Sequence, residues 1–117
     1  MKRSRVLFLC LLIVCANYSF ARQGADGLNE QQRLGRQLVA QACGVCHLPP
    51  ARNTRTYGPL LNKAAGRGDD GVVREYILDG TPRMPAFKHF LRPAEIDAII
   101  AYLRTVPVPA PAPASRS

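Results

Sequence analysis

Two cysteines followed at once by a histidine constrain this chain more than any other feature. They form the sequence Cys43-Gly44-Val45-Cys46-His47. Two thiols at this spacing can each add to a vinyl group along one edge of a porphyrin, and the adjacent histidine then lies beneath the iron. The motif therefore predicts one covalently attached haem c, tethered through Cys43 and Cys46, with His47 as an axial ligand. A chain with this motif must fold around a large, flat and mostly apolar group.

Two other chemistries use closely spaced cysteines, and each needs features that are not seen here. A thioredoxin-like pair is expected in a strand–helix–strand setting, and no convincing strand pattern is visible. A zinc site needs two further ligands. The sequence has one other histidine, His89, and its other cysteines, Cys10 and Cys15, lie near the N-terminus. Haem attachment is therefore the favoured interpretation, with the dithiol and zinc sites as alternatives.

The first 21 residues have the three-part plan of a secretory signal peptide. A short basic start precedes the apolar run 6–16, and Ser19 and Ala21 supply small residues for cleavage after Ala21. The apolar run is short for a membrane span, which needs about 20 residues. We expect export to the periplasm. An uncleaved anchor is the main alternative, and lipid attachment at Cys15 is a weaker one because Val14 before it is not small.

The charge of the chain remains positive after the signal is removed. The formal net charge of +8 falls to +5, with thirteen basic residues against eight acidic ones. Export argues against a nucleic acid partner. A basic exported redox protein is expected to meet redox protein partners with an acidic docking surface, an electrostatic effect that acts mainly on association rate. A solvated basic surface without any steering role is the alternative.

The hydrophobic pattern predicts an all-α fold. We expect helices over about 30–42, about 71–80, and from Pro93 to a point before Pro107, with at most a short helix near 60–65. Three or four helices on roughly 80 foldable residues give a thin core, and a bound haem would complete it. The expected organisation has four parts, listed in chain order: signal peptide 1–21, flexible N-terminus 22–29, haem-binding domain 30–106, and Pro/Ala-rich tail 107–117.

Apolar residues define one face of each expected helix. In the first helix Leu34, Leu38, Val39 and Ala42 form a stripe, and Gly35 interrupts the helix where a close helix crossing would need a small residue. The apolar faces of the other two helices consist of Val72, Val73, Tyr76 and Ile77 in the second helix, and Ile96, Ile99, Ile100 and Leu103 in the last. Asp69 or Asp70 is expected to cap the second helix.

Met84 is the leading candidate for the second axial ligand of the iron. It is the only methionine beyond the signal and lies in Arg83-Met84-Pro85, between two expected helices. A thioether opposite a histidine is a known haem ligation that raises the reduction potential. Two alternatives remain: Met84 fills a gap in the core, or His89 is the ligand and gives a bis-histidine centre.

The ordered set of motifs resembles class I cytochrome c. The resemblance extends from Gly35 to Leu103, with Met84 placed 37 residues beyond His47. The matching pieces are, in order, a helix that ends in the Cys43–His47 motif, Tyr57-Gly58-Pro59-Leu60, Arg83-Met84-Pro85, and a last helix with Ala101-Tyr102-Leu103. The resemblance implies the cytochrome c fold, one covalently bound haem, and electron transfer.

The resemblance also implies roles for residues outside the motif. The carbonyl of Pro59 is expected to accept a hydrogen bond from His47 Nδ1, which orients the imidazole. Gly35 corresponds to the small residue where the first and last helices cross, near Tyr102. Four residues are expected to wall the haem pocket: Leu60, Leu61, Ile99 and Leu103.

The chain departs from the family pattern in two ways. There is no tryptophan, which some members place against a haem propionate, and Arg92 stands before Pro93 where a Ser, Thr or Asp cap is usual. Tyr57, Lys63 and Arg67 are the weak candidates for propionate partners.

Three functions follow from these features. The first is a monomeric, periplasmic carrier of single electrons. It is not itself an enzyme, and it meets a membrane only through a partner or an uncleaved signal. The second is a dedicated cytochrome subunit or electron acceptor of a periplasmic dehydrogenase, either a quinoprotein or a sulfur-oxidising enzyme, and the proline-rich tail hints at such an attachment. The third, a ligand-binding or peroxidase centre, requires the loss of Met84 from the iron.

Overall fold

The computed structural model describes residues 26–49 and 55–110. The chain divides into two compact units, 1–30 and 31–117. In the described end of the first unit, the Asp26 carboxylate accepts a hydrogen bond from Leu28 N–H at 3.2 Å. The predicted signal peptide lies outside the described residues, as do the first half of the predicted flexible N-terminus (22–25) and the end of the predicted tail (111–117).

The described residues form an all-α fold, as predicted. Their elements are, in chain order, the α-helix α2 (Glu30–Leu38), the π-helix η1 (Val39–Cys43), α3 (Gly44–His47), the 3₁₀-helix η2 (Ala65–Gly68), α4 (Asp70–Asp79) and α5 (Pro93–Leu103). Within residues 26–49 and 55–110, the β-structure consists of one isolated bridge between Thr81 and Met84. No helix in this part of the chain is both long and apolar enough to cross a bilayer.

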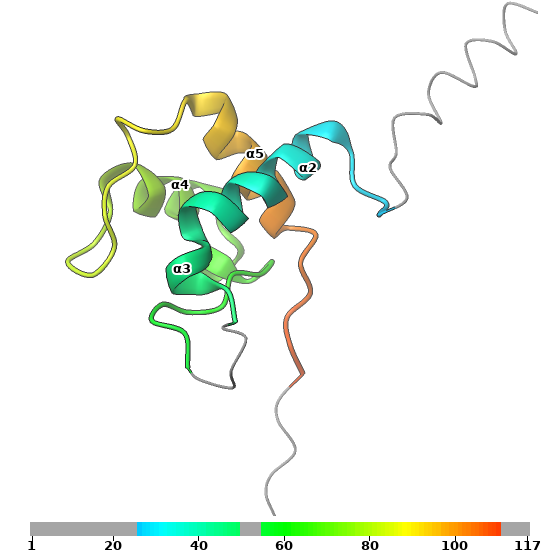
Figure 1. The fold of residues 1–117 in the computed structure, drawn as a ribbon, viewed down its shortest axis with the longest axis horizontal. Helices are drawn as coiled ribbons and strands as arrows, with labels where there is room; N and C mark the ends of the chain where they lie inside the picture. Colours follow the sequence, from blue (N-terminus) through cyan, green and yellow to red (C-terminus); the bar gives the residue numbers. More distant parts are fainter. Residues whose placement is uncertain (1–25, 50–54, 111–117) are drawn as a thin grey trace, which may run out of the picture. The chain divides into compact units, whose positions relative to one another are not determined.

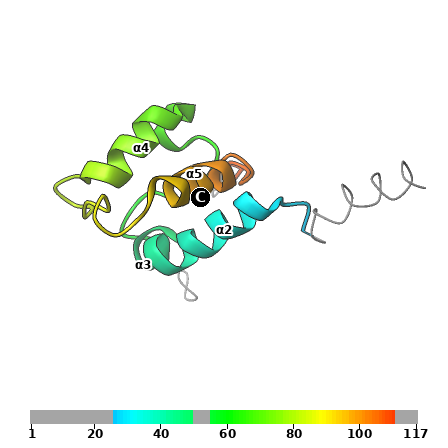
Figure 2. The ribbon, with the colours of Figure 1, turned by 90° about the horizontal axis from the view of Figure 1, so that it is seen from above.

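Helix α5 provides the centre of the core. Figure 2 shows it between α4 on one side and α2 with α3 on the other. Its side chains Ile96, Ile99 and Leu103 are fully buried. Val73 and Ile77 of α4 and Val39 of η1 pack into the same cluster. The predicted apolar spacing of the last helix is therefore confirmed.

The first helix continues beyond the apolar pattern 30–42 into the motif, as the family resemblance implied, and three of the four residues of its predicted stripe pack in or against the core: Val39, Leu38 and Ala42. It runs through η1 and α3 to the histidine of the motif (Figure 1). Gly35, Val39, Cys43 and His47, spaced four residues apart, are its buried residues. Leu34 is 41% exposed, so the prediction that it belongs to the buried stripe is wrong. The face of this helix that carries Gly35 packs against α5. Leu34 therefore points away from the contact between the two helices.

Gly35 brings the first and last helices into backbone contact, as the family resemblance implied. A Cβ at this position would lie 1.9 Å from the Ala98 carbonyl oxygen and 2.8 Å from Tyr102 Cβ. Real Cβ atoms do not approach other atoms so closely. Glycine is therefore required at this crossing, which offsets its poor helix propensity.

Helix α4 begins and ends where the sequence predicts. The Asp69 carboxylate accepts hydrogen bonds from Gly71 N–H at 2.7 Å and Val72 N–H at 3.2 Å, which caps the helix. At the other end Gly80 adopts a φ of 70°, in the region that favours glycine.

Residues 60–64 form loop and turn, within the prediction of a loop with at most a short helix near 60–65. The chain turns at 62–64, where Asn62 Oδ1 accepts a hydrogen bond from Ala64 N–H at 2.9 Å, and the 3₁₀-helix η2 follows. Gly66 in η2 has a φ of 62°, and a Cβ there would lie 2.7 Å from Val73 Cγ2. Tight packing of this turn against α4 therefore determines where the helical turn forms.

Helix α5 replaces the usual polar cap with a carboxylate from its first turn. Glu95 accepts a hydrogen bond from Arg92 N–H at 2.7 Å and pairs with the Arg92 guanidinium at 2.9 Å. The side-chain hydrogen bond to Arg92 is the main reason that the pKa of Glu95 is lowered. Glu95 thus stabilises the helix start despite the absence of Ser, Thr or Asp before Pro93.

Candidate functional site

An apolar cavity of about 600 Å³ lies among the helices. The Cys43–His47 motif lines one part of it, and the segment 57–66, helix α4, the loop 81–87 and helix α5 line the rest. The apolar wall includes the side chains predicted to form it: Leu60, Leu61, Ile99 and Leu103. Leu60 is 42% exposed and therefore stands at the rim, whereas Ile99 and Leu103 are buried.

Both cysteines of the motif line the cavity and neither is in a disulfide. Cys43 is buried and Cys46 is half-buried. Burial is the main reason that the pKa of the Cys43 thiol is raised, and charge on Cys46 acts in the same direction. The two thiols therefore lie on one wall of the cavity, as attachment along one porphyrin edge requires.

His47 is buried and held in a defined orientation. Its Nδ1 lies 2.7 Å from the Pro59 carbonyl oxygen. Because a carbonyl can only accept, Nδ1 carries the proton in this bond, and Nε2 is left with its lone pair for a metal. Gly58 lies against the ring, where a Cβ would be 2.6 Å from His47 Cε1. The Gly58-Pro59 segment thus forms a close-fitting support for the imidazole.

Met84 lines the same cavity from the loop between α4 and α5. Its backbone is paired with Thr81, with Thr81 N–H donating to Met84 O at 2.8 Å and Met84 N–H donating to Thr81 O at 3.1 Å. A Cβ on Gly80 would lie 2.4 Å from Met84 O, so the helix-ending glycine also permits this tight loop. Further along, Phe87 N–H donates to Ile77 O at 2.8 Å and ties the loop to α4.

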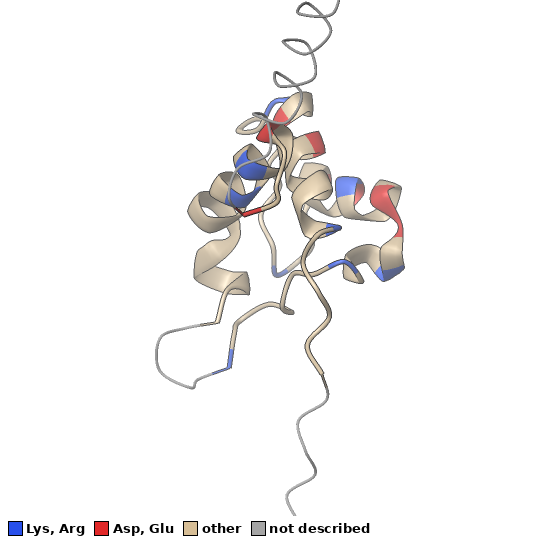
Figure 3. Cartoon of the chain, turned by 90° about the vertical axis from the view of Figure 1, so that its right-hand side faces the viewer, with Lys and Arg blue, Asp and Glu red and all other residues tan. Residues whose placement is uncertain are grey.

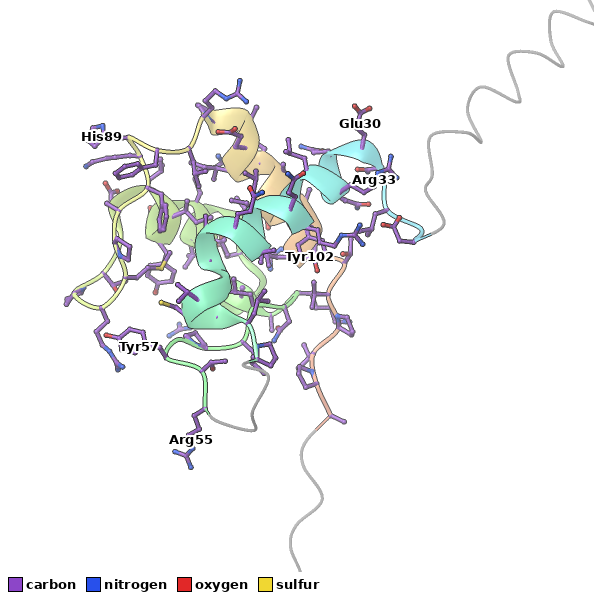
Figure 4. The ribbon with its side chains drawn as sticks, viewed as in Figure 1. Glu30, Arg33, Arg55, Tyr57, His89 and Tyr102 are labelled. Atoms are coloured by element: carbon purple, nitrogen blue, oxygen red, sulfur yellow. The ribbon has the colours of Figure 1, made fainter. Side chains whose placement is uncertain are left out.

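His89, the alternative ligand, lies elsewhere. It is exposed and is not among the cavity-lining residues. Figure 4 shows it at the outer edge of the loop between α4 and α5. The geometry therefore favours Met84 over His89 as the side chain that can reach a group bound in the cavity.

Of the three candidate propionate partners, Tyr57 lines the cavity, while Lys63 and Arg67 are not among its lining residues. Sequence reasoning missed three polar residues that do line it, Asn62, Thr81 and Arg83. The Arg83 guanidinium carbon lies 4.9 Å from the centre of the Tyr57 ring. The position of Arg83 next to Met84 was the one signal in the sequence that could have identified it as a residue of the cavity.

These residues fit a covalently attached haem. The cavity is apolar and of the size usual for a cofactor site. Its walls present two thiols, an imidazole with a free Nε2, and a thioether. Among residues 26–49 and 55–110, no three His, Cys, Asp or Glu side chains are grouped as metal ligands, which the zinc alternative requires. A strand–helix–strand unit, which the dithiol alternative requires, is likewise not formed by these residues.

Comparison with known families decides between these alternatives. A family model described as cytochrome C oxidase, cbb3-type, subunit III matches residues 30–103. The chain belongs to this family of c-type cytochromes. The match begins at the first residue of α2 and ends at the last residue of α5, so it contains the whole described cavity. Searches of curated proteins and of solved structures gave no match.

Membership confirms the predicted recognition and fold. A c-type cytochrome binds haem c covalently and transfers electrons, and it acts as a carrier or as a subunit of an oxidase complex. Redox partners follow from the same membership.

Proposed function

We propose that this chain is a periplasmic monohaem c-type cytochrome that carries single electrons between redox proteins. In this proposal Cys43 and Cys46 hold one haem, and His47 and Met84 are its axial ligands. The observation that supports it most is that one cavity brings together the two thiols, the oriented imidazole and the thioether.

Each residue has a distinct task in this proposal. When bound, the haem supplies the one-electron couple. The Pro59 carbonyl accepts the Nδ1 proton of His47, which fixes the ring and makes Nε2 a stronger donor. Met84 supplies a sulfur ligand, which favours the reduced state and raises the potential. With both axial positions filled by the protein, the arrangement favours electron transfer over ligand binding or peroxidase chemistry.

The walls and the rim of the cavity have different roles. Buried Ile99 and Leu103 exclude water from the cavity. The solvation of the site therefore changes little when the site gains or loses an electron. The exposed side chains at the rim, Leu60 and Tyr57, mark where electrons would enter and leave.

The surface charge suits transient docking to an acidic partner. Figure 3 shows Lys and Arg on several elements, with acidic residues among them on the helices. The excess of basic residues would raise the association rate at low salt, and the effect would weaken as salt is added. Export through a signal peptide at 1–21, with a tail at 107–117 beyond the folded domain and a monomeric state, completes the proposal.

The experiment that tests the proposal assigns the sixth ligand. The oxidised holoprotein is expected to show an iron–sulfur charge-transfer band and a high midpoint in a redox titration. Met84→Ala should remove the band and lower the midpoint, whereas the matched variant His89→Ala should leave both unchanged. A wild-type protein without the band, which loses its sixth ligand in His89→Ala but keeps it in Met84→Ala, would contradict the assignment.

The family description supports a second candidate, a haem subunit of a membrane oxidase complex. The matching family is named for subunit III of a cbb3-type oxidase. A subunit of a periplasmic dehydrogenase is the other dedicated role that the sequence predicts. Purification of the tagged full chain from gently solubilised membranes separates these roles, because a dedicated subunit would co-purify with a large partner and a shuttle would not.

A further inference from the structure

Arg83 and Tyr57 come from two loops that meet at the edge of the cavity. Tyr57 directly precedes Gly58-Pro59, the segment that supports His47, and Arg83 directly precedes Met84. The Arg83 guanidinium carbon lies 4.9 Å from the centre of the Tyr57 ring, and both side chains line the cavity. Figure 4 shows Tyr57 beside the tip of the loop between α4 and α5. The contact thus joins the loop that supports His47 to the loop that carries Met84.

We propose that Arg83 and Tyr57 are positioning residues that hold the Met84 loop closed over the haem through a cation–π contact. The proposal rests on the proposed function, because it assumes that Met84 is the axial ligand. Neither residue binds the iron. Their effect is on the equilibrium between a closed loop, with the sulfur at the metal, and an open loop, with the sixth position free.

The hydrogen bonds of this loop do not join it to the loop that supports His47. Within the described residues, they run among residues 81–84, or back to α4 through the backbone N–H groups of Phe87 and Lys88. Those bonds shape the loop and anchor its C-terminal half. They leave the tip, where Arg83 lies, to be held by its contact with Tyr57.

The size of the expected effect follows from the chemistry of the contact. Tyr57 is 60% exposed, so the attraction between guanidinium and ring is that of an exposed cation–π pair. Such a contact changes an equilibrium constant by about two- to fivefold. Loss of the contact should therefore raise the open fraction of the loop by about two- to fivefold.

Binding of imidazole to the oxidised holoprotein measures this open fraction. Imidazole must displace Met84, so its apparent dissociation constant is the intrinsic constant divided by the fraction of open loop. The titration is followed by the loss of the iron–sulfur charge-transfer band. Tyr57→Leu and Arg83→Gln should each lower the apparent dissociation constant by about two- to fivefold.

Three further variants make the test specific. Tyr57→Phe keeps the aromatic face and should bind imidazole like the wild type. The double variant Tyr57→Leu/Arg83→Gln should bind no more tightly than the tighter single variant, because both substitutions remove the same contact. Lys88→Gln is the matched control: it removes another exposed cation of this loop and its 3.2 Å pair with Asp79, but keeps the Lys88 N–H bond to Leu78 O that anchors the loop, and it should leave the affinity unchanged.

Several results would overturn the inference. Unchanged affinity in both single variants would show that the contact does not hold the loop. An effect of Arg83→Gln without an effect of Tyr57→Leu would show that Arg83 acts alone, for example on a haem propionate. Additive effects in the double variant would show two independent roles. A wild-type protein without the iron–sulfur band would instead refute the proposed function, so the two failures are distinguishable.

Discussion

Gly35→Ala tests the close crossing of the first and last helices, on which the shape of the haem cavity depends. The new Cβ would lie 1.9 Å from the Ala98 carbonyl oxygen, whereas ordinary contacts begin at 3.4 Å. The obstacle is backbone in the middle of α5, so no side-chain rotation can relieve it. The two helices must separate, and the fully buried Ala98 and Ile99 would lose part of their packing.

Two opposing terms set the magnitude of this effect. Overpacking costs about 1–3 kcal/mol, and a clash with backbone falls at the upper end of that range. Replacing a helical glycine by alanine returns up to about 1 kcal/mol through helix propensity. We expect a net loss of about 2 kcal/mol in the free energy of unfolding, or a fall in Tm of roughly 10 °C for a domain of this size.

Denaturant titration of the holoprotein, followed by far-ultraviolet circular dichroism and by the haem absorbance, measures the loss. Gly71→Ala is the matched control. The new Cβ there would lie 3.1 Å from the Asp69 carboxylate that caps α4, a side chain that can shift. A gain in helix propensity of up to about 1 kcal/mol opposes the strain on the cap, so any loss of stability should stay well below that of Gly35→Ala. A Gly35→Ala protein as stable as the wild type would refute the argument that backbone contact requires glycine.

Three further predictions concern single contacts. Asp69→Ala should lower the free energy of unfolding by about 1 kcal/mol through loss of the α4 cap, and Asp69→Asn should restore most of it, as denaturant titration would show. Gly58→Ala should displace the His47 ring, because the new Cβ would lie 2.6 Å from His47 Cε1. The displaced ring should shift the midpoint potential, and an unchanged potential and Soret spectrum would contradict this. Because the pKa of Glu95 is lowered in the folded state, the ionised carboxylate stabilises the fold. This stabilisation is complete at a pH above the ordinary pKa of 4.5, and it is lost as the pH falls through the lowered pKa of the folded state. Wild type should therefore exceed Glu95→Gln in stability at pH 7, and the difference should shrink as the pH is lowered below 4.5; a constant difference would argue against the charge-assisted bond to Arg92.

Local features of this fold could be read from the sequence because local interactions determine them. The cap at Asp69, the proline that begins α5 and the spacing of Ile96, Ile99 and Leu103 each depend on residues within one or two helical turns. The motif at Cys43–His47 also carries its own chemistry, since adjacent residues supply both thiols and the imidazole.

Features that depend on distant residues could not be read in the same way. The sequence predicts a loop with at most a short helix near 60–65, whereas the helical turn lies at η2, where Gly66 packs against Val73 of a different helix. Leu34 fits the apolar pattern of its helix but is exposed, because the contact of Gly35 with α5 sets which side is buried.

The contact between Arg83 and Tyr57 shows the same limit at the site itself. The two residues are 26 positions apart in loops, where periodicity gives no information about neighbours. Only the folded arrangement brings the residue before Met84 against the residue before Gly58.

Mass spectrometry of the mature protein is the direct test of haem attachment to the two cysteines. The protein should be produced in cells that attach haem to exported c-type cytochromes, then measured intact and after proteolysis. We expect an intact mass raised by one haem, carried by one peptide that contains both Cys43 and Cys46 as thioethers. A colourless protein with the mass of the bare polypeptide, or one in which both thiols react with alkylating reagent, would contradict it.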